Sequence, residues 1–81
     1  MYKISVTPDD IAKGKPYMVN SCPIAKAVRR VVGHRKIKVD WGRVSIDGKI
    51  YYPDTSISSF VYNFDRGLKT YPFSFLLSKG W

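Results

Sequence analysis

The stretch from Cys22 to Gly33 constrains the fold of this chain most, because it alone carries a complete helix signature. At about 100° per residue, its apolar side chains fall within one arc of roughly 140°. They are Ile24, Ala27, Val28, Val31 and Val32. Asn20 and Ser21 are candidate N-caps, and Pro23 suits the first turn. Gly33 is a natural C-terminal stop. We therefore expect a helix with one face packed into a core.

The other face of this helix is basic and opens the most positively charged segment of the chain. The net charge is +8 over 81 residues. Residues 26–49 carry +6 of it, because they hold eight basic residues and two acidic ones, Asp40 and Asp47. The eight are Lys26, Arg29, Arg30, Arg35, Lys36, Lys38, Arg43 and Lys49. Such a surface attracts polyanions in a salt-dependent way, whether nucleic acid, anionic membrane or acidic protein.

Size and composition indicate one folded domain over residues 1–81. A hydrophobic content of 44% with 15% aromatic residues is typical of a globular protein. No apolar run approaches the roughly 18 residues of a membrane helix, and the N-terminus lacks a signal-peptide segment. We therefore expect a cytoplasmic protein. Cys22 is the single cysteine and His34 the single histidine, so we expect no internal disulfide, no metal site and no cofactor.

The N-terminal part of the chain predicts a strand and a short helix. Alternating residues from Tyr2 to Thr7 are typical of a half-buried strand. Thr7 and Pro8, followed by two aspartates, indicate a helix start. Gly14 and Pro16 should end this helix within about two turns.

After His34 the apolar period changes from about 3.6 to 2 residues, which predicts a β-meander. A tight turn at Trp41–Gly42 would pair the apolar residues, Val39 with Val44 and Ile37 with Ile46.

Asp47 and Gly48 signal a second turn, for which two registers are open. A two-residue loop would place Ile46 opposite Lys49. A three-residue loop with a bulge would instead pair apolar residues, Ile46 with Ile50 and Val44 with Tyr52. We favour the three-residue loop.

The C-terminal part predicts a third helix and a last strand. The helical spacing involves Ile57, Phe60, Val61 and Phe64, and this helix should end at Gly67. Residues 70–77 alternate, with Pro72 favouring an edge position or a strand start. The element order is β-α-α-β-β-β-α-β. We expect an α+β domain in which a mostly antiparallel four-stranded sheet packs on two to three helices.

The meander register predicts a binding surface on its outward side. Lysines supply point charges to phosphates, an arginine can fork onto a phosphate or a base edge, and an exposed tyrosine can stack on an unpaired base. Together with the basic helix face, the candidate binding residues are Lys26, Arg29, Arg30, Arg35, Lys36, Lys38, Arg43 and Tyr51. The alternative is a solvated face whose charges block edge pairing and keep the protein soluble.

The sequence does not favour catalysis. Cys22 lies at a helix start, where a dipole and arginines lower a thiol pKa. No partner completes a nucleophilic set with His34, however, and the six acidic residues include no convincing acid/base pair. We expect a non-enzymatic protein. A helix-turn-helix is also disfavoured, because the connector before residue 22 is too long for its turn.

Three segments carry a resemblance to a known group of proteins. Residues 22–30 begin Cys-Pro-Ile-Ala and end in paired arginines, residues 64–67 read Phe-Asp-Arg-Gly, and residues 72–75 read Pro-Phe-Ser-Phe. In these segments the chain resembles small proteins encoded by bacteriophages, over about a third of its length. The resemblance implies a fold and a context more than an activity. Small phage proteins often bind host complexes, including polymerases, nucleases and nucleic-acid-guided defence machinery.

Two functions follow as hypotheses. The first is a small non-enzymatic nucleic-acid-binding protein, phage-encoded, that contacts phosphates through its basic helix and β-meander. The second is a phage accessory protein that binds and modulates or inhibits a host protein complex in the cytoplasm of the infected cell, through a few aromatic and arginine hot spots. The partner is nucleic acid in the first case and an acidic host protein in the second.

Overall fold

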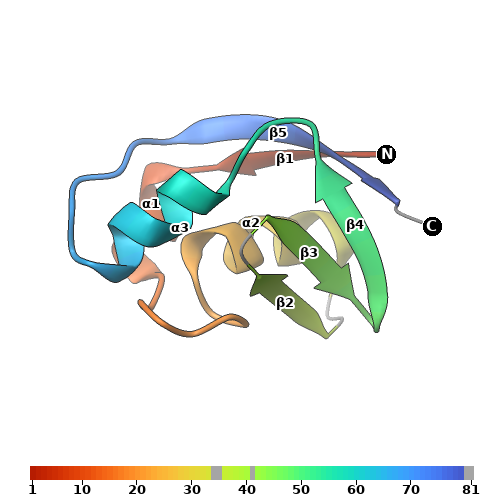
Figure 1. Cartoon of the computed structure of the whole chain (residues 1–81), viewed down its shortest axis with the longest axis horizontal. Helices are drawn as coiled ribbons and strands as arrows, with labels where there is room; N and C mark the ends of the chain where they lie inside the picture. The colour runs from red at the N-terminus through yellow and green to blue at the C-terminus, as the bar shows by residue number, and fades with distance from the viewer. Residues whose placement is uncertain (34–35, 41, 80–81) are drawn as a thin grey trace.

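The α+β class and the predicted element order are confirmed by a computed structural model, which describes residues 1–33, 36–40 and 42–79. The elements are β1 (Tyr2–Val6), α1 (Pro8–Lys13), α2 (Pro23–Val32), β2 (Ile37–Asp40), β3 (Arg43–Ile46), β4 (Lys49–Pro53), α3 (Ser58–Asp65) and β5 (Phe73–Lys79) (Figure 1). Among these residues, no helix is both long and apolar enough to cross a membrane.

The sheet has five strands in the order β1-β5-β4-β3-β2, so the expected count of four is wrong. The N-terminal strand joins the same sheet because it pairs antiparallel with β5, with Ile4 opposite Phe75. All neighbouring strands are antiparallel. Strand β5 is therefore internal, and Pro72 immediately precedes it, as a strand-start proline should.

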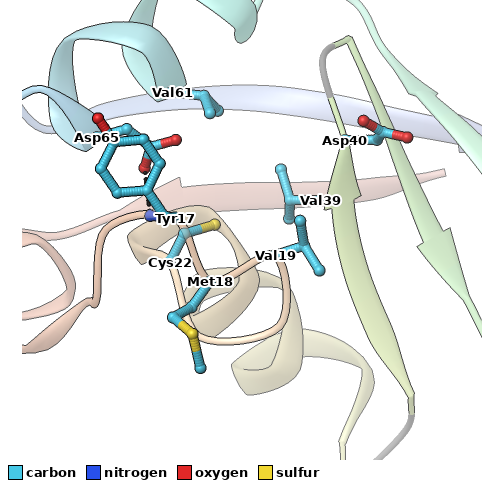
Figure 2. A pocket seen from close by; sticks show the side chains of 8 residues that line it. All are labelled: Tyr17, Met18, Val19, Cys22, Val39, Asp40, Val61 and Asp65. Atoms are coloured by element: carbon cyan, nitrogen blue, oxygen red, sulfur yellow. Dashed lines mark hydrogen bonds between the residues drawn. The ribbon is translucent and has the colours of Figure 1, made fainter.

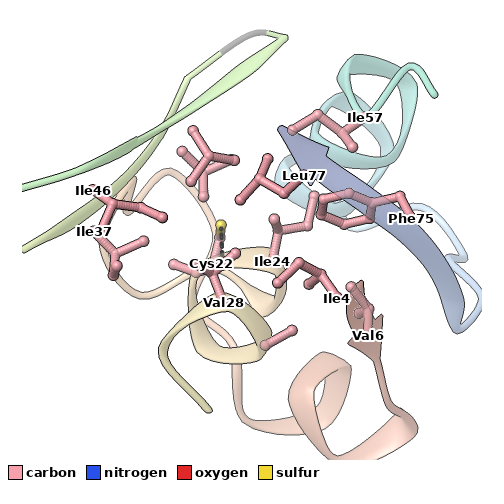
Figure 3. Close-up of a cluster of buried hydrophobic side chains, with 14 residues drawn as sticks. Ile4, Val6, Cys22, Ile24, Val28, Ile37, Ile46, Ile57, Phe75 and Leu77 are labelled. Atoms are coloured by element: carbon pink, nitrogen blue, oxygen red, sulfur yellow. Dashed lines mark hydrogen bonds between the residues drawn. The ribbon is translucent and has the colours of Figure 1, made fainter. Parts of the chain in front are cut away.

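The sheet curls around α2, which contacts both of its edge strands, β1 and β2. The core fills the concave side between helix and sheet (Figure 3). From α2 it takes Ile24 and Val28, and from opposite ends of the sheet Ile4 and Ile37, all buried. We call the side of the sheet that points away from α2 the outer sheet face.

The ends of α1 and α2 follow local chemistry. Thr7 and Asp10 form a reciprocal capping box at the start of α1. The sequence predicts the helix start at Thr7 but not the return bond from Asp10. The N-cap of α2 is Cys22, whose Sγ accepts the amide of Ala25 at 3.5 Å, so the expected caps at Asn20 and Ser21 are wrong. Gly33 ends α2 at φ 87°, a conformation that glycine adopts without strain.

The apolar arc of α2 is buried only in its first two turns. Ile24, Ala27 and Val28 are buried and Val32 is partly buried. Val31 is 45% exposed, so its assignment to the core is wrong. Residue spacing alone gives the direction of a side chain but not how far the sheet extends along the helix.

The first hairpin has the predicted register and the second does not. Strands β2 and β3 pair Val39 with Val44. Strands β3 and β4 pair Ile46 with Lys49 and Val44 with Tyr51, which is the two-residue loop that we did not favour.

The reason for the second register is the backbone of the turn. Asp47 and Gly48 both have positive φ, 52° and 82°, as in the tight turn that matches the twist of the flanking strands. Asp47 also exchanges hydrogen bonds with the backbone of Lys36, since its Oδ1 accepts the Lys36 amide at 2.9 Å. These local terms outweigh the mismatch of Ile46 with Lys49, whose ammonium reaches solvent at the end of the sheet.

Candidate functional site

The outer sheet face of the β2–β3 hairpin gathers three basic side chains. Lys38 lies on β2 and Arg43 on β3, and Lys36 precedes β2 by one residue with the same parity as Lys38. Their strand neighbours Ile37, Val39 and Val44 point into the core. Alternation along each strand therefore forces Lys36, Lys38 and Arg43 outward, and all three are exposed.

Two shallow hollows lie at opposite ends of this hairpin face. Lys36, Lys38 and Ser45 line the first, beside the turn formed by Asp47 and Gly48. The second is lined by Asp40, Gly42, Arg43 and Tyr52. Arg43 and Tyr52 stand opposite each other, one step beyond the Val44–Tyr51 pair.

Most carboxylates in this protein are engaged in holding the fold. Asp47 accepts the Lys36 amide, Asp54 accepts the Leu76 amide and Asp65 accepts the Tyr17 amide. Asp40 also has a partner. Within the described residues, the ion pairs are Lys13–Asp9 and Arg30–Asp10, so neither includes Lys36, Lys38 or Arg43. The three cations are therefore available to an external anion.

The predicted outward direction of Tyr51 is wrong. The two-residue turn places Tyr51 opposite Val44, so its ring points to the concave side and packs against the core, 6.0 Å from the ring of Tyr2. The exposed aromatic residue of the outer face is Tyr52, at 50% exposure. The Asp-Gly dipeptide was the signal that favours this register.

The basic residues of α2 lie on a different side of the molecule and mainly hold the structure together. Arg30 forms an ion pair with the buried Asp10 and donates to the Ser5 carbonyl, which ties α2 to α1 and β1. Arg29 donates to the Asn20 carbonyl at 2.9 Å. Arg29 and Arg30 are therefore engaged in contacts within the chain, and their predicted role in binding stays a prediction.

Lys26 shares an open hollow with the acidic residues of α1 and with both arginines. It is partly exposed and makes no ion pair among the described residues. The predicted binding residues thus divide between α2 and the outer sheet face, which point in opposite directions from the core. Arg35 lies outside the described residues.

Asp10 provides a stability test of this interpretation. Burial raises its pKa, but hydrogen bonds from Thr7 and Arg30 outweigh that effect and hold the pKa below its ordinary value. The contribution of Asp10 to stability is therefore complete above pH about 4 and is lost as the pH falls through the lower, folded-state pKa. We expect Asp10→Asn to lower the free energy of unfolding at pH 7 by about 1.5–3 kcal/mol and to flatten the acid dependence of stability.

Urea unfolding at several pH values measures both effects. Asp9→Asn is the matched control, because Asp9 is an exposed carboxylate of the same helix whose ion pair is with the exposed Lys13. Its loss should cost well under about 1 kcal/mol. Equal effects of the two substitutions would contradict the structural role given to Asp10.

Cys22 is a buried structural residue in this fold. Burial raises the pKa of its thiol, which keeps it protonated and poorly nucleophilic at neutral pH. Its sulfur lies beside a cavity of about 200 Å³ between the connector before α2, strand β2 and helix α3 (Figure 2). Within the part of the chain that is described, no cluster of three His, Cys, Asp or Glu side chains has the arrangement of a metal site.

The rim of this cavity is apolar and exposed. Tyr17 is 69% exposed, and Met18 and Val19 are about half exposed. The Tyr17 amide donates to Asp65 of α3 at 2.9 Å. The Val19 carbonyl accepts the amide of Val39, so the connector covers part of the edge of β2. The connector is thus anchored by its backbone and directs its side chains outward.

Comparisons of the chain with protein-family models, with curated proteins and with solved structures find no match. A functional assignment therefore rests on the geometry of this chain itself.

Proposed function

We propose that this protein is a non-enzymatic nucleic-acid-binding protein that contacts the phosphate backbone through the outer face of its β2–β3 hairpin. One observation supports this most: Lys36, Lys38 and Arg43 are exposed on one face and belong to no ion pair of the described chain. Three exposed cations on one hairpin face are suited to a polyanion.

The mechanism is electrostatic positioning. Lys36 and Lys38 lie two residues apart, so their backbones are separated by about 6.7 Å along one face. They act as point charges, whereas the Arg43 guanidinium can donate two parallel hydrogen bonds to a phosphate. Two acidic residues, Asp40 opposite Arg43 and Asp47 beside Lys36, lie next to the three basic ones, so these five side chains together keep a net formal charge of +1.

Titration of a labelled mixed-sequence oligonucleotide at several salt concentrations tests the proposal. We expect the logarithm of the binding constant to fall linearly with the logarithm of salt concentration, with a slope of about −2 to −3 for three phosphate contacts. Polyglutamate in excess serves as a control. A surface that binds any polyanion would bind the polyglutamate and release the oligonucleotide. Absence of binding at low salt would contradict the proposal.

A second candidate function, binding to a host protein as a phage accessory protein, is supported by the exposed connector. Tyr17 and Met18 form an apolar rim around a cavity, and aromatic residues and methionine are enriched in protein interfaces. Capture from a nuclease-treated host lysate tests it when the wild type is compared with Tyr17→Ser/Met18→Ser. A partner that survives nuclease and is lost with the double variant would support this function. Partners that all disappear with nuclease would contradict it.

A further inference from the structure

We infer that the preferred ligand is a single-stranded nucleic acid with one unpaired base stacked on Tyr52. This inference rests on the proposed function and specifies the ligand of the same surface. It depends on what lies beside the three cations and on which shapes of nucleic acid can reach them.

Tyr52 is the exposed aromatic residue that lies beside the three cations on the outer sheet face. It projects from β4 on the outer side and lines the same hollow as Arg43. Because the two residues stand opposite each other on adjacent strands, their Cβ atoms should lie about 5 Å apart. A base stacked on the Tyr52 ring would therefore carry its phosphate within reach of the Arg43 guanidinium.

Two apolar side chains lie near Tyr52 on the outer sheet face, although Ser78 stands opposite it on β5 and Asp40 lines the same hollow. Ile50 precedes it by two residues on the same side of β4, and Leu76 projects outward from the neighbouring β5 with 38% exposure. Neither side chain belongs to the buried core cluster. Ile50, Tyr52 and Leu76 thus form an apolar platform beside Lys38 and Arg43, which suits the apolar faces of bases and the charged phosphates that link them.

A duplex cannot use this platform. The major groove is about 12 Å wide and admits a helix or a two-stranded ribbon, whereas five strands at about 4.8 Å spacing span about 19 Å. Bases within a duplex are stacked on each other and do not reach Tyr52. The helix α2 offers no alternative for reading a groove, because Arg29 and Arg30 are held by Asn20, Asp10 and Ser5.

The test compares one single-stranded oligonucleotide, as DNA and as RNA, with the duplex DNA of the same sequence. We expect each single strand to bind at least about tenfold more tightly than the duplex, because base stacking contributes only to the single strand. Tyr52→Ser should weaken single-strand binding by about tenfold and leave the salt slope unchanged, since it removes no charge. Tyr52→Phe should retain the affinity.

Tyr71→Ser is the matched control, because Tyr71 is also an exposed tyrosine but lies in the loop before β5. It should bind like the wild type, and thermal unfolding of each variant verifies the fold. Equal or tighter binding of the duplex, or an unchanged affinity of Tyr52→Ser, would overturn this inference while leaving the proposed function intact. Absence of binding to all three oligonucleotides would instead overturn the proposed function.

Discussion

Replacing Lys36, Lys38 and Arg43 together by glutamate is expected to lower the affinity for a single-stranded oligonucleotide by about 100-fold or more at low salt. Each substitution removes a charge-assisted contact of about 1 kcal/mol or more and adds a repelling carboxylate. The salt slope should also fall by about 2 to 3, because these residues release the counterions. Fluorescence anisotropy at several salt concentrations measures both changes.

The control for this experiment changes the net charge by the same amount elsewhere. Lys15, Arg66 and Lys69 are exposed, and the loop that carries Arg66 and Lys69 follows α3, at the far end of the long axis from the β3–β4 turn (Figure 1). Their replacement by glutamate should weaken binding by only a few-fold, through the long-range field. If both triple variants lost affinity equally, net charge and not the hairpin face would account for binding.

A second large effect is expected on stability. Ile24 is fully buried on α2, and Figure 3 shows it among Ile4, Phe75 and Leu77. We expect Ile24→Ala to lower the free energy of unfolding by about 3–4 kcal/mol, since it leaves a cavity between helix and sheet. A chain of this size is stable by only about 4–12 kcal/mol, so this single substitution should remove from about a quarter to all of the stability.

Val31→Ala on the same helix is the matched control. Periodicity alone places Val31 in the core, whereas the structure exposes it to 45%. Its substitution should therefore cost less than about 0.5 kcal/mol, with the higher helix propensity of alanine offsetting the small loss of contacts. Urea denaturation of both variants measures the difference. Comparable losses at the two positions would contradict the packing of α2 against the curled sheet.

The element order was predictable from the sequence because each element has a strong local signal. Thr7 and Pro8 start α1, Gly33 ends α2, and the alternation from Ile37 to Ile46 gives the first hairpin register correctly. The membership of all five strands in one sheet was not predictable in the same way. Pairing of β1 with β5 joins residues about seventy positions apart, and no local pattern specifies it.

The candidate site was predicted in part, and its errors have physical causes. Lys36, Lys38 and Arg43 face outward as expected, because the first hairpin fixes their parity. Apolar pairing alone predicts that Tyr51 faces outward, whereas the turn preference of Asp-Gly places Tyr52 there, because a shift of one residue reverses every side chain.

The arginines of α2 illustrate a second limit. Helix periodicity correctly places Arg30 away from the core, but it does not reveal that α1 brings the buried Asp10 to meet it. Partners supplied by another element decide whether a surface cation is available. The sequence therefore shows which basic side chains point away from the core, but not which of them are held by partners from other elements.

The most direct test of the account is the mapping of amide chemical shifts by nuclear magnetic resonance during titration with a single-stranded oligonucleotide. We expect the largest changes on residues 36–40, 43–46 and 50–52, which belong to the hairpin and the adjoining strand. Changes confined to α2, or to the connector over residues 15–21, would contradict the claim that the outer sheet face is the binding surface.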